Sequence, residues 1–139
     1  MKIISGTITD ITEGIICHQT NCKKVAGTGL ALAIRNKYTN WYKEFRLYDG
    51  ELGMCWLYDV NDKLTIASLY AQNGYGRDIR FTEYWAFRNC LKALKKQNGY
   101  DKQIYIPAGI GCRNAGGDWN IIEKLIEEYL PDSILIAYN

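Results

Sequence analysis

The stretch Ile15-Ile16-Cys17-His18-Gln19-Thr20-Asn21-Cys22, followed five residues later by Gly27-Thr28-Gly29-Leu30-Ala31, decides the fold of this chain. A short apolar strand leads into a loop that carries the only histidine, and glycines then open a helical stretch. Backbone N–H groups at the start of such a helix, with no side chains in the way, form a site for a phosphate. An imidazole beside a phosphate site indicates phosphate-ester or ribose chemistry.

The far end of the chain repeats this arrangement. Residues 103–107 are predicted as a strand, 108–117 as a glycine-rich loop, and a helix follows from Asp118. The loop is not the phosphate loop of a nucleoside triphosphatase, because Gly117 replaces the lysine of that motif and Asp118 its Ser/Thr. It also lacks the glycine spacing of a dinucleotide-binding loop. Two such corners, each a strand followed by a glycine-rich loop and a helix, can bind a diphosphate from both sides. The alternative interpretation of the second loop is a wide turn with glycines at positive φ.

Length and composition describe one soluble globular domain over residues 1–139, with 47% apolar and 23% charged residues. No apolar run is long enough to span a membrane, and the first residues do not resemble a signal peptide. The five cysteines are odd in number and scattered, which argues against a disulfide framework and predicts a cytoplasmic location. A net charge of +2 is too small to indicate nucleic acid as a partner.

The hydrophobic pattern predicts an α/β protein without repeats or linkers. The expected strands cover 2–4, 14–20, 54–58, 64–70, 103–107 and 134–138, and the expected helices cover 30–38, 82–96 and 119–130, with 41–45 extending the first helix as a short turn. Asn98-Gly99 and Pro131 should end the last two helices. Alternating elements of this kind form a mixed sheet covered by helices on both faces, with ligands bound at the carboxyl ends of the strands.

Several polar residues of these loops have two interpretations. His18 is either a buried histidine with a structural role or a group that faces a ligand. Asn21 either satisfies the backbone of a turn or binds ribose hydroxyls. Asp118 is expected to cap its helix. No Cys-x-x-Cys pair and no second histidine accompany His18, so we expect no metal. Residues on the ligand edge after the strand 64–70 are Gln72, Asn73, Tyr75 and Arg77.

The whole pattern resembles the macrodomain family. The resemblance lies in His18-Gln19-x-Asn21-Cys22, Gly27-x-Gly29-Leu30-Ala31, Tyr70-x-Gln72, Ile106-Pro107-x-x-Ile110-Gly111-Cys112 and Gly116-Gly117-Asp118-Trp119, in the order and spacing of the family. It spans nearly the whole chain and is closest to small bacterial and phage macrodomains that process ADP-ribose 1″-phosphate. This similarity implies a three-layer α/β/α fold with a mostly parallel sheet that binds ADP-ribose along its edge.

The resemblance also assigns residues to roles. It implies that His18 and Asn21 are catalytic, with His18 acting on the 1″-phosphate and Asn21 holding the distal ribose. The residues that it implies for substrate binding are Ile8, Gly27, Thr28, Gly29, Leu30, Gln72, Gly109, Ile110, Gly111, Cys112 and Arg113. No metal and no cofactor is implied.

The chain departs from the family pattern at several positions. Thr7 replaces an aspartate that grips the adenine amino group, and Asp10 lies three residues away from it. Arg113 adds bulk and charge where relatives have glycine. In the branch that removes ADP-ribose from glutamate or nucleic-acid bases, a lysine and an aspartate do the chemistry. Gln72 and Ala115 stand near those positions, so that lysine mechanism is disfavoured.

Three functional hypotheses follow. The first is a phosphatase that hydrolyses the phosphate of ADP-ribose 1″-phosphate through His18. The second is a binding protein that sequesters ADP-ribose or a cyclic ADP-ribose signal without turnover, and a phage-encoded version would act in the host cytoplasm. The third is a hydrolase of ADP-ribosyl groups on protein or nucleic acid. Thr7 and Arg113 favour the second hypothesis more than in a typical relative. The partner that we predict is a small-molecule ADP-ribose derivative, and we expect neither a membrane nor nucleic acid as a partner.

Overall fold

The computed structural model describes residues 1–75 and 80–138. Its elements are β1 (Lys2–Ser5), the short 3-10 helix η1 (Ile8–Asp10), β2 (Gly14–Asn21), α1 (Gly29–Lys37), α2 (Thr39–Leu47), β3 (Cys55–Asp59), β4 (Leu64–Gln72), α3 (Tyr84–Asn98), β5 (Ile104–Pro107), α4 (Trp119–Tyr129) and β6 (Ile134–Ala137). No helix within these described residues is both long and apolar enough to cross a membrane.

The strands form one six-stranded sheet in the order β1-β6-β5-β2-β4-β3. Every neighbouring pair is parallel except β3 and β4, which are antiparallel. The predicted α/β class with a mixed, mostly parallel sheet is therefore confirmed. Because β1, β2, β4, β5 and β6 run in the same direction, their carboxyl ends lie at one edge of the sheet, where the residues that follow them can form a common site.

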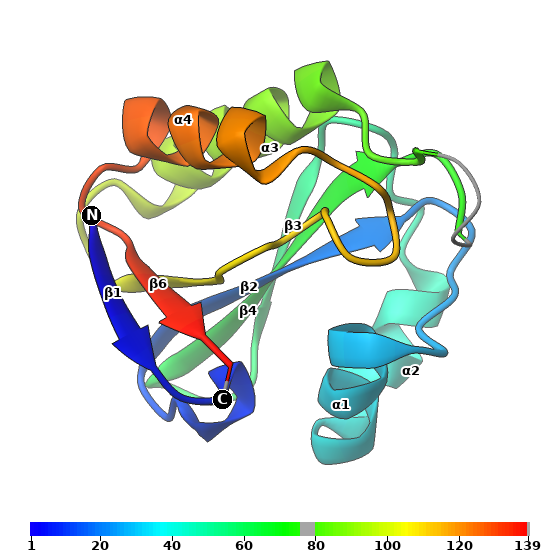
Figure 1. Ribbon diagram of the computed structural model, residues 1–139. Helices are drawn as coiled ribbons and strands as arrows, with labels where there is room; N and C mark the ends of the chain where they lie inside the picture. The colour runs from blue at the N-terminus through cyan, green and yellow to red at the C-terminus, as the bar shows by residue number, and fades with distance from the viewer. Residues whose placement is uncertain (76–79, 139) are drawn as a thin grey trace.

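Helices cover both faces of the sheet, so the molecule has three layers (Figure 1). Helices α3 and α4 pack on one face and share one apolar core with it, while α1 and α2 cover the other face over a second core. Strand β2 contributes to both cores, with Ile15 and Cys17 in the first and Ile16 in the second. A central strand buried on both faces is rigid, and it therefore fixes the residues at its carboxyl end.

One local prediction needs correction, and one short element was not predicted. The segment 41–45 belongs to a separate helix, α2, because the backbone turns at Tyr38 (φ −118°, ψ 73°) before Thr39. This turn lets Trp41 and Phe45, one helical turn apart, bury their rings completely against the sheet. The sequence pattern also missed the 3-10 turn η1, which follows β1.

The predicted helix ends are confirmed. Helix α3 ends at Asn98, and Gly99 follows with a positive φ of 60°. Helix α4 begins after Asp118, whose carboxylate accepts a hydrogen bond from the Asn120 N–H at 2.9 Å, and it ends at Tyr129, shortly before Pro131.

Candidate ligand-binding site

A pocket of about 710 Å³ lies across the carboxyl ends of the parallel strands. All thirteen site residues expected from the sequence line it. They are Ile8 in η1; His18 and Asn21 of β2; Gly27, Thr28, Gly29 and Leu30 at the start of α1; Gln72 at the end of β4; and Gly109, Ile110, Gly111, Cys112 and Arg113 after β5. The fold therefore brings together residues from five separate segments. Their individual roles remain predictions.

The start of α1 forms one wall of the pocket. Thr28 precedes the helix without a side-chain cap, so the N–H groups of the first turn, from Gly29 to Ala31, lack partners of the usual capping kind. Gly29 has a positive φ of 57°, which a residue with a side chain rarely adopts. The geometry therefore presents free amide donors and a helix N-terminus to the pocket, and both favour a bound anion.

Asn21 holds the loop that leads to this helix. Its Nδ2 donates to the Val25 carbonyl at 3.0 Å, and its Oδ1 accepts from the N–H groups of Lys23 at 2.9 Å and Val25 at 3.4 Å. Asn21 is 4% exposed. Of the two interpretations, the structure supports its role in satisfying turn backbone, and that role still leaves the residue in the pocket wall.

The loop after β5 forms the opposite wall. Two of its amides are used internally, from Ile110 to the Pro107 carbonyl and from Cys112 to the Gly109 carbonyl. The intervening amides of Gly109, Gly111 and Arg113 have no hydrogen-bond partner within the described part of the chain. Alternate amides are thus available to a ligand, as expected of a concave backbone that binds phosphate.

A network of side chains, which the sequence pattern did not reveal, fixes this second loop. Gln19 donates from Nε2 to Gln72 Oε1 at 3.0 Å and to Thr82 Oγ1 at 2.9 Å. Thr82 in turn donates to the carbonyl of Gly111 at 2.7 Å, and Gln72 donates to the Gly74 carbonyl. The partners come from β2, β4, the residues before α3 and the loop itself. The one sequence signal for this network is the change from apolar to polar residues at the end of β2.

Gly111 has no room for a side chain beside this network. A Cβ at this position would lie 2.7 Å from Gln19 Oε1, and Gly111 has a positive φ of 75°. A side chain here would displace the Gln19 amide, and the backbone conformation favours glycine.

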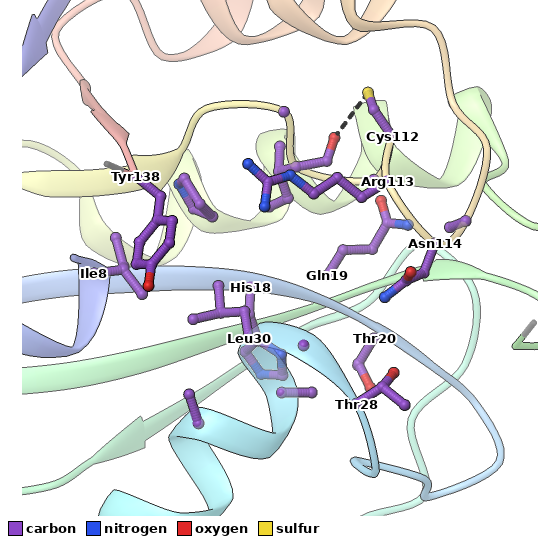
Figure 2. Close-up of a pocket in the computed structure, with 18 of the residues that line it drawn as sticks. Ile8, His18, Gln19, Thr20, Thr28, Leu30, Cys112, Arg113, Asn114 and Tyr138 are labelled. Atoms are coloured by element: carbon purple, nitrogen blue, oxygen red, sulfur yellow. Dashed lines mark hydrogen bonds between the residues drawn. The ribbon is translucent and has the colours of Figure 1, made fainter. Parts of the chain in front are cut away.

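His18 forms part of the pocket floor but is 1% exposed. Its Nε2 lies 2.6 Å from Ser68 Oγ, and Trp41 packs edge-on against its ring at a centroid distance of 5.2 Å. Its Nδ1 is buried without a hydrogen-bond partner among the described residues. Figure 2 shows the ring tucked beside Leu30 of α1. His18 therefore combines a structural position in the aromatic core with one polar atom that is left unpaired.

Burial lowers the pKa of His18 from 6.5 to about 4, because a charged imidazolium is disfavoured in a dry surrounding. The imidazole is therefore neutral at pH 7. A neutral ring can donate or accept a hydrogen bond, but it does not supply the proton of an imidazolium. Burial, with a smaller effect of Asp118, also raises the pKa of Cys112 to about 11, so this thiol is uncharged as well.

The pocket is nearly free of charge. Among the described residues, no aspartate, glutamate or lysine lines it, and Arg113 is its only charged side chain. Additional lining residues that the sequence analysis did not select include Thr9, Thr20, Asn114, Ile136 and Tyr138. Tyr138 is 69% exposed, and in Figure 2 its ring stands at one end of the pocket, near Ile8.

Of the other residues expected on the ligand edge, some line the pocket and others do not. Tyr75 and Thr7 line the pocket, whereas Asp10 does not. Asn73 is not in the pocket lining and donates a hydrogen bond to Glu83 Oε1 at 2.8 Å. Arg77 lies outside the described residues.

Fold and site together define a three-layer α/β protein with a pocket at the carboxyl edge of its sheet. No protein-family model and no curated protein matches the chain. Solved structures do match. A Bacteroides thetaiotaomicron protein shares 27% identity at a TM-score of 0.87, over 100% of this chain and 99% of that one. The macrodomain of Mycobacterium tuberculosis DarG shares 18% identity at a TM-score of 0.81, over 99% and 95% of the two chains.

A Trypanosoma brucei macrodomain, solved in complex with ADP-ribose, shares 15% identity at a TM-score of 0.69 over 98% of this chain and 62% of that one. These structures confirm the resemblance at the level of the fold: the chain has the macrodomain fold.

Proposed function

We propose that the pocket binds ADP-ribose or a closely related nucleoside diphosphate sugar. The observation that carries this proposal is the pair of facing walls, the N-terminus of α1 and the alternate amides of the loop after β5, in a pocket without a carboxylate. Hydrogen-bond donors on both sides stabilise the negative charge of a diphosphate. The T. brucei macrodomain solved with ADP-ribose supports the same ligand class.

The two ends of the pocket suit the two halves of such a ligand. The end near Ile8, Ile136 and Tyr138 is apolar and has an exposed aromatic ring, which favours a flat base. The end near Thr28 and Asn114 is polar, and the hydroxyl and amide groups of these residues favour a ribose.

Hydrolysis of the phosphate of ADP-ribose 1″-phosphate is the second candidate function. The buried Nδ1 of His18 in the pocket floor favours it. This atom has no protein partner among the described residues, so a ligand or a water molecule would have to satisfy its hydrogen-bonding capacity. The lowered pKa weighs against turnover, since a neutral imidazole with a pKa of about 4 is a weak base. These observations favour binding over catalysis.

Removal of ADP-ribosyl groups from protein or nucleic acid receives less support. Within the described residues the pocket offers no lysine and no carboxylate to attack or activate a glycosidic bond. Gln72 is engaged with Gln19 and with the Gly74 carbonyl.

The decisive experiment measures calorimetric binding of ADP-ribose and phosphate release from ADP-ribose 1″-phosphate, in the wild type and in His18→Ala. We expect binding in both proteins. Turnover that disappears in His18→Ala would establish the phosphatase, and binding without turnover in either protein would establish a binding protein. Absence of ADP-ribose binding in the folded wild type would overturn the proposal.

A further inference from the structure

Arg113 is the only charged side chain that lines the pocket within the described residues. Its side chain is exposed, and in residues 1–75 and 80–138 it makes no hydrogen bond or ion pair; the ion pair found there joins Lys24 and Asp49, away from the pocket lining. Because no described protein group pairs with it, the guanidinium of Arg113 can direct all of its N–H donors at a ligand.

The Arg113 side chain runs along the pocket from the second loop. In Figure 2 it starts from the second loop and extends toward the end that Tyr138 and Ile8 line, rather than toward Thr28. Asn114, the next residue, points the other way, and its Nδ2 lies 3.4 Å from the position of a Cβ on Gly29. Arg113 and Asn114 thus point toward opposite halves of the pocket.

The Arg113 charge has no acidic counterpart in the described pocket lining. No carboxylate among the described residues lines the pocket, so none there is available to accept a hydrogen bond from the amino group of an adenine. Thr7 and Thr9 supply only neutral hydroxyl groups. The guanidinium adds a charged group to this lining, and its planar set of donors matches a phosphate group in a bidentate geometry.

We propose that Arg113 determines ligand specificity by selecting ligands with a phosphate on the nucleoside half in addition to the diphosphate, such as ADP-ribose phosphorylated at the 2′ position. This inference rests on the proposed function, because it assumes that the diphosphate lies between the two loops and the base near Tyr138. Arg113 acts here as a binding residue and takes no part in bond breaking.

The test compares three ligands by calorimetry: ADP-ribose, its 2′-phosphate and its 1″-phosphate. The last two carry the same added group at opposite ends, so they separate position from charge. We expect the wild type to bind the 2′-phosphate about tenfold more tightly than ADP-ribose, as one charge-assisted contact provides. Arg113→Gln should abolish this preference, and Arg113→Lys should retain part of it because the charge remains but the fork geometry is lost.

Arg80→Gln is the matched control, because Arg80 is also exposed but lies over the Tyr84 ring and outside the pocket lining. It should bind all three ligands as the wild type does. If the wild type binds ADP-ribose and its 2′-phosphate with equal affinity, the inference about Arg113 fails while the proposed function stands. The same holds for an equal loss for all three ligands in Arg113→Gln, which would make Arg113 a contact of the diphosphate. If no ligand binds to the folded wild type, the proposed function fails as well.

Discussion

The two loops that face each other across the pocket are both anchored by β2, but in different ways. Asn21 holds the first loop through hydrogen bonds to residues two and four positions ahead in the chain. Gln19 holds the second loop through Thr82, which is 63 residues away in sequence and bonds to Gly111. One anchor is local and the other joins distant segments. Similar glycine-rich walls can therefore depend on different kinds of support. One experiment below perturbs the pocket floor between the two walls, and two others test the two anchors separately.

The largest effect should come from pH, which perturbs the floor beneath the first loop. His18 has a pKa of about 4 in the folded protein against 6.5 for a free histidine, so the unfolded chain binds more protons between these values. The stabilisation is therefore complete above pH 6.5 and is lost as the pH falls toward 4. Its full size is about 3 kcal/mol.

Because His18 is the only histidine, chemical denaturation at pH 7, 6 and 5 reports this group directly. His18→Gln removes the titration and should flatten the dependence over this range, whatever its own stability. An equal slope in the variant and the wild type would show that other groups are responsible.

Asn21→Ala should have the next largest effect and should act on the first loop. It removes three hydrogen bonds of a side chain that is 4% exposed, and it leaves the backbone groups of Lys23 and Val25 without those partners. We expect a loss of about 2 kcal/mol in the free energy of unfolding. Hydrogen exchange should increase in residues 23–28 while 109–113 remain as in the wild type. Equal increases in both loops would contradict separate anchoring.

Gly111→Ala, compared with Gly109→Ala, tests the support of the second loop. Both glycines have positive φ values, 75° and 83°, so both variants carry a similar backbone strain of about 1 kcal/mol. Only Gly111→Ala also places a Cβ 2.7 Å from Gln19 Oε1, whereas no atom lies within 4 Å of a Cβ at Gly109.

We therefore expect Gly111→Ala to lose about 1 kcal/mol more stability than Gly109→Ala, measured by denaturant unfolding. In a Gln19→Ala background, which removes the close contact, Gly111→Ala and Gly109→Ala should be equally destabilising. If the two single variants are equally stable, Gln19 does not constrain the second loop.

Sequence patterns predicted most of the fold because its signals are local. The apolar run 15–17, the helical spacing of 82–96 and the stop at Asn98-Gly99 each involve neighbours in the chain. The separate helix α2 was missed because its cause, the burial of Trp41 and Phe45 on the sheet, is a tertiary contact. The same limit applies to the site: the predicted residues gather in one pocket, but Gln19 and Tyr138 were not selected, since their partners and neighbours come from other elements.

The alternation of apolar strands, glycine-rich loops and helices was enough to predict that two such loops follow parallel strands and lie at one edge of a sheet, because these signals are read from neighbouring residues. The state of the groups between the two loops depends instead on the tertiary structure. Packing against Trp41 and Ser68 makes His18 a buried, neutral ring, and the absence of carboxylates from the described pocket lining leaves Arg113 as its one charge. Burial and charge depend on which distant residues come into contact, and local sequence does not specify those contacts.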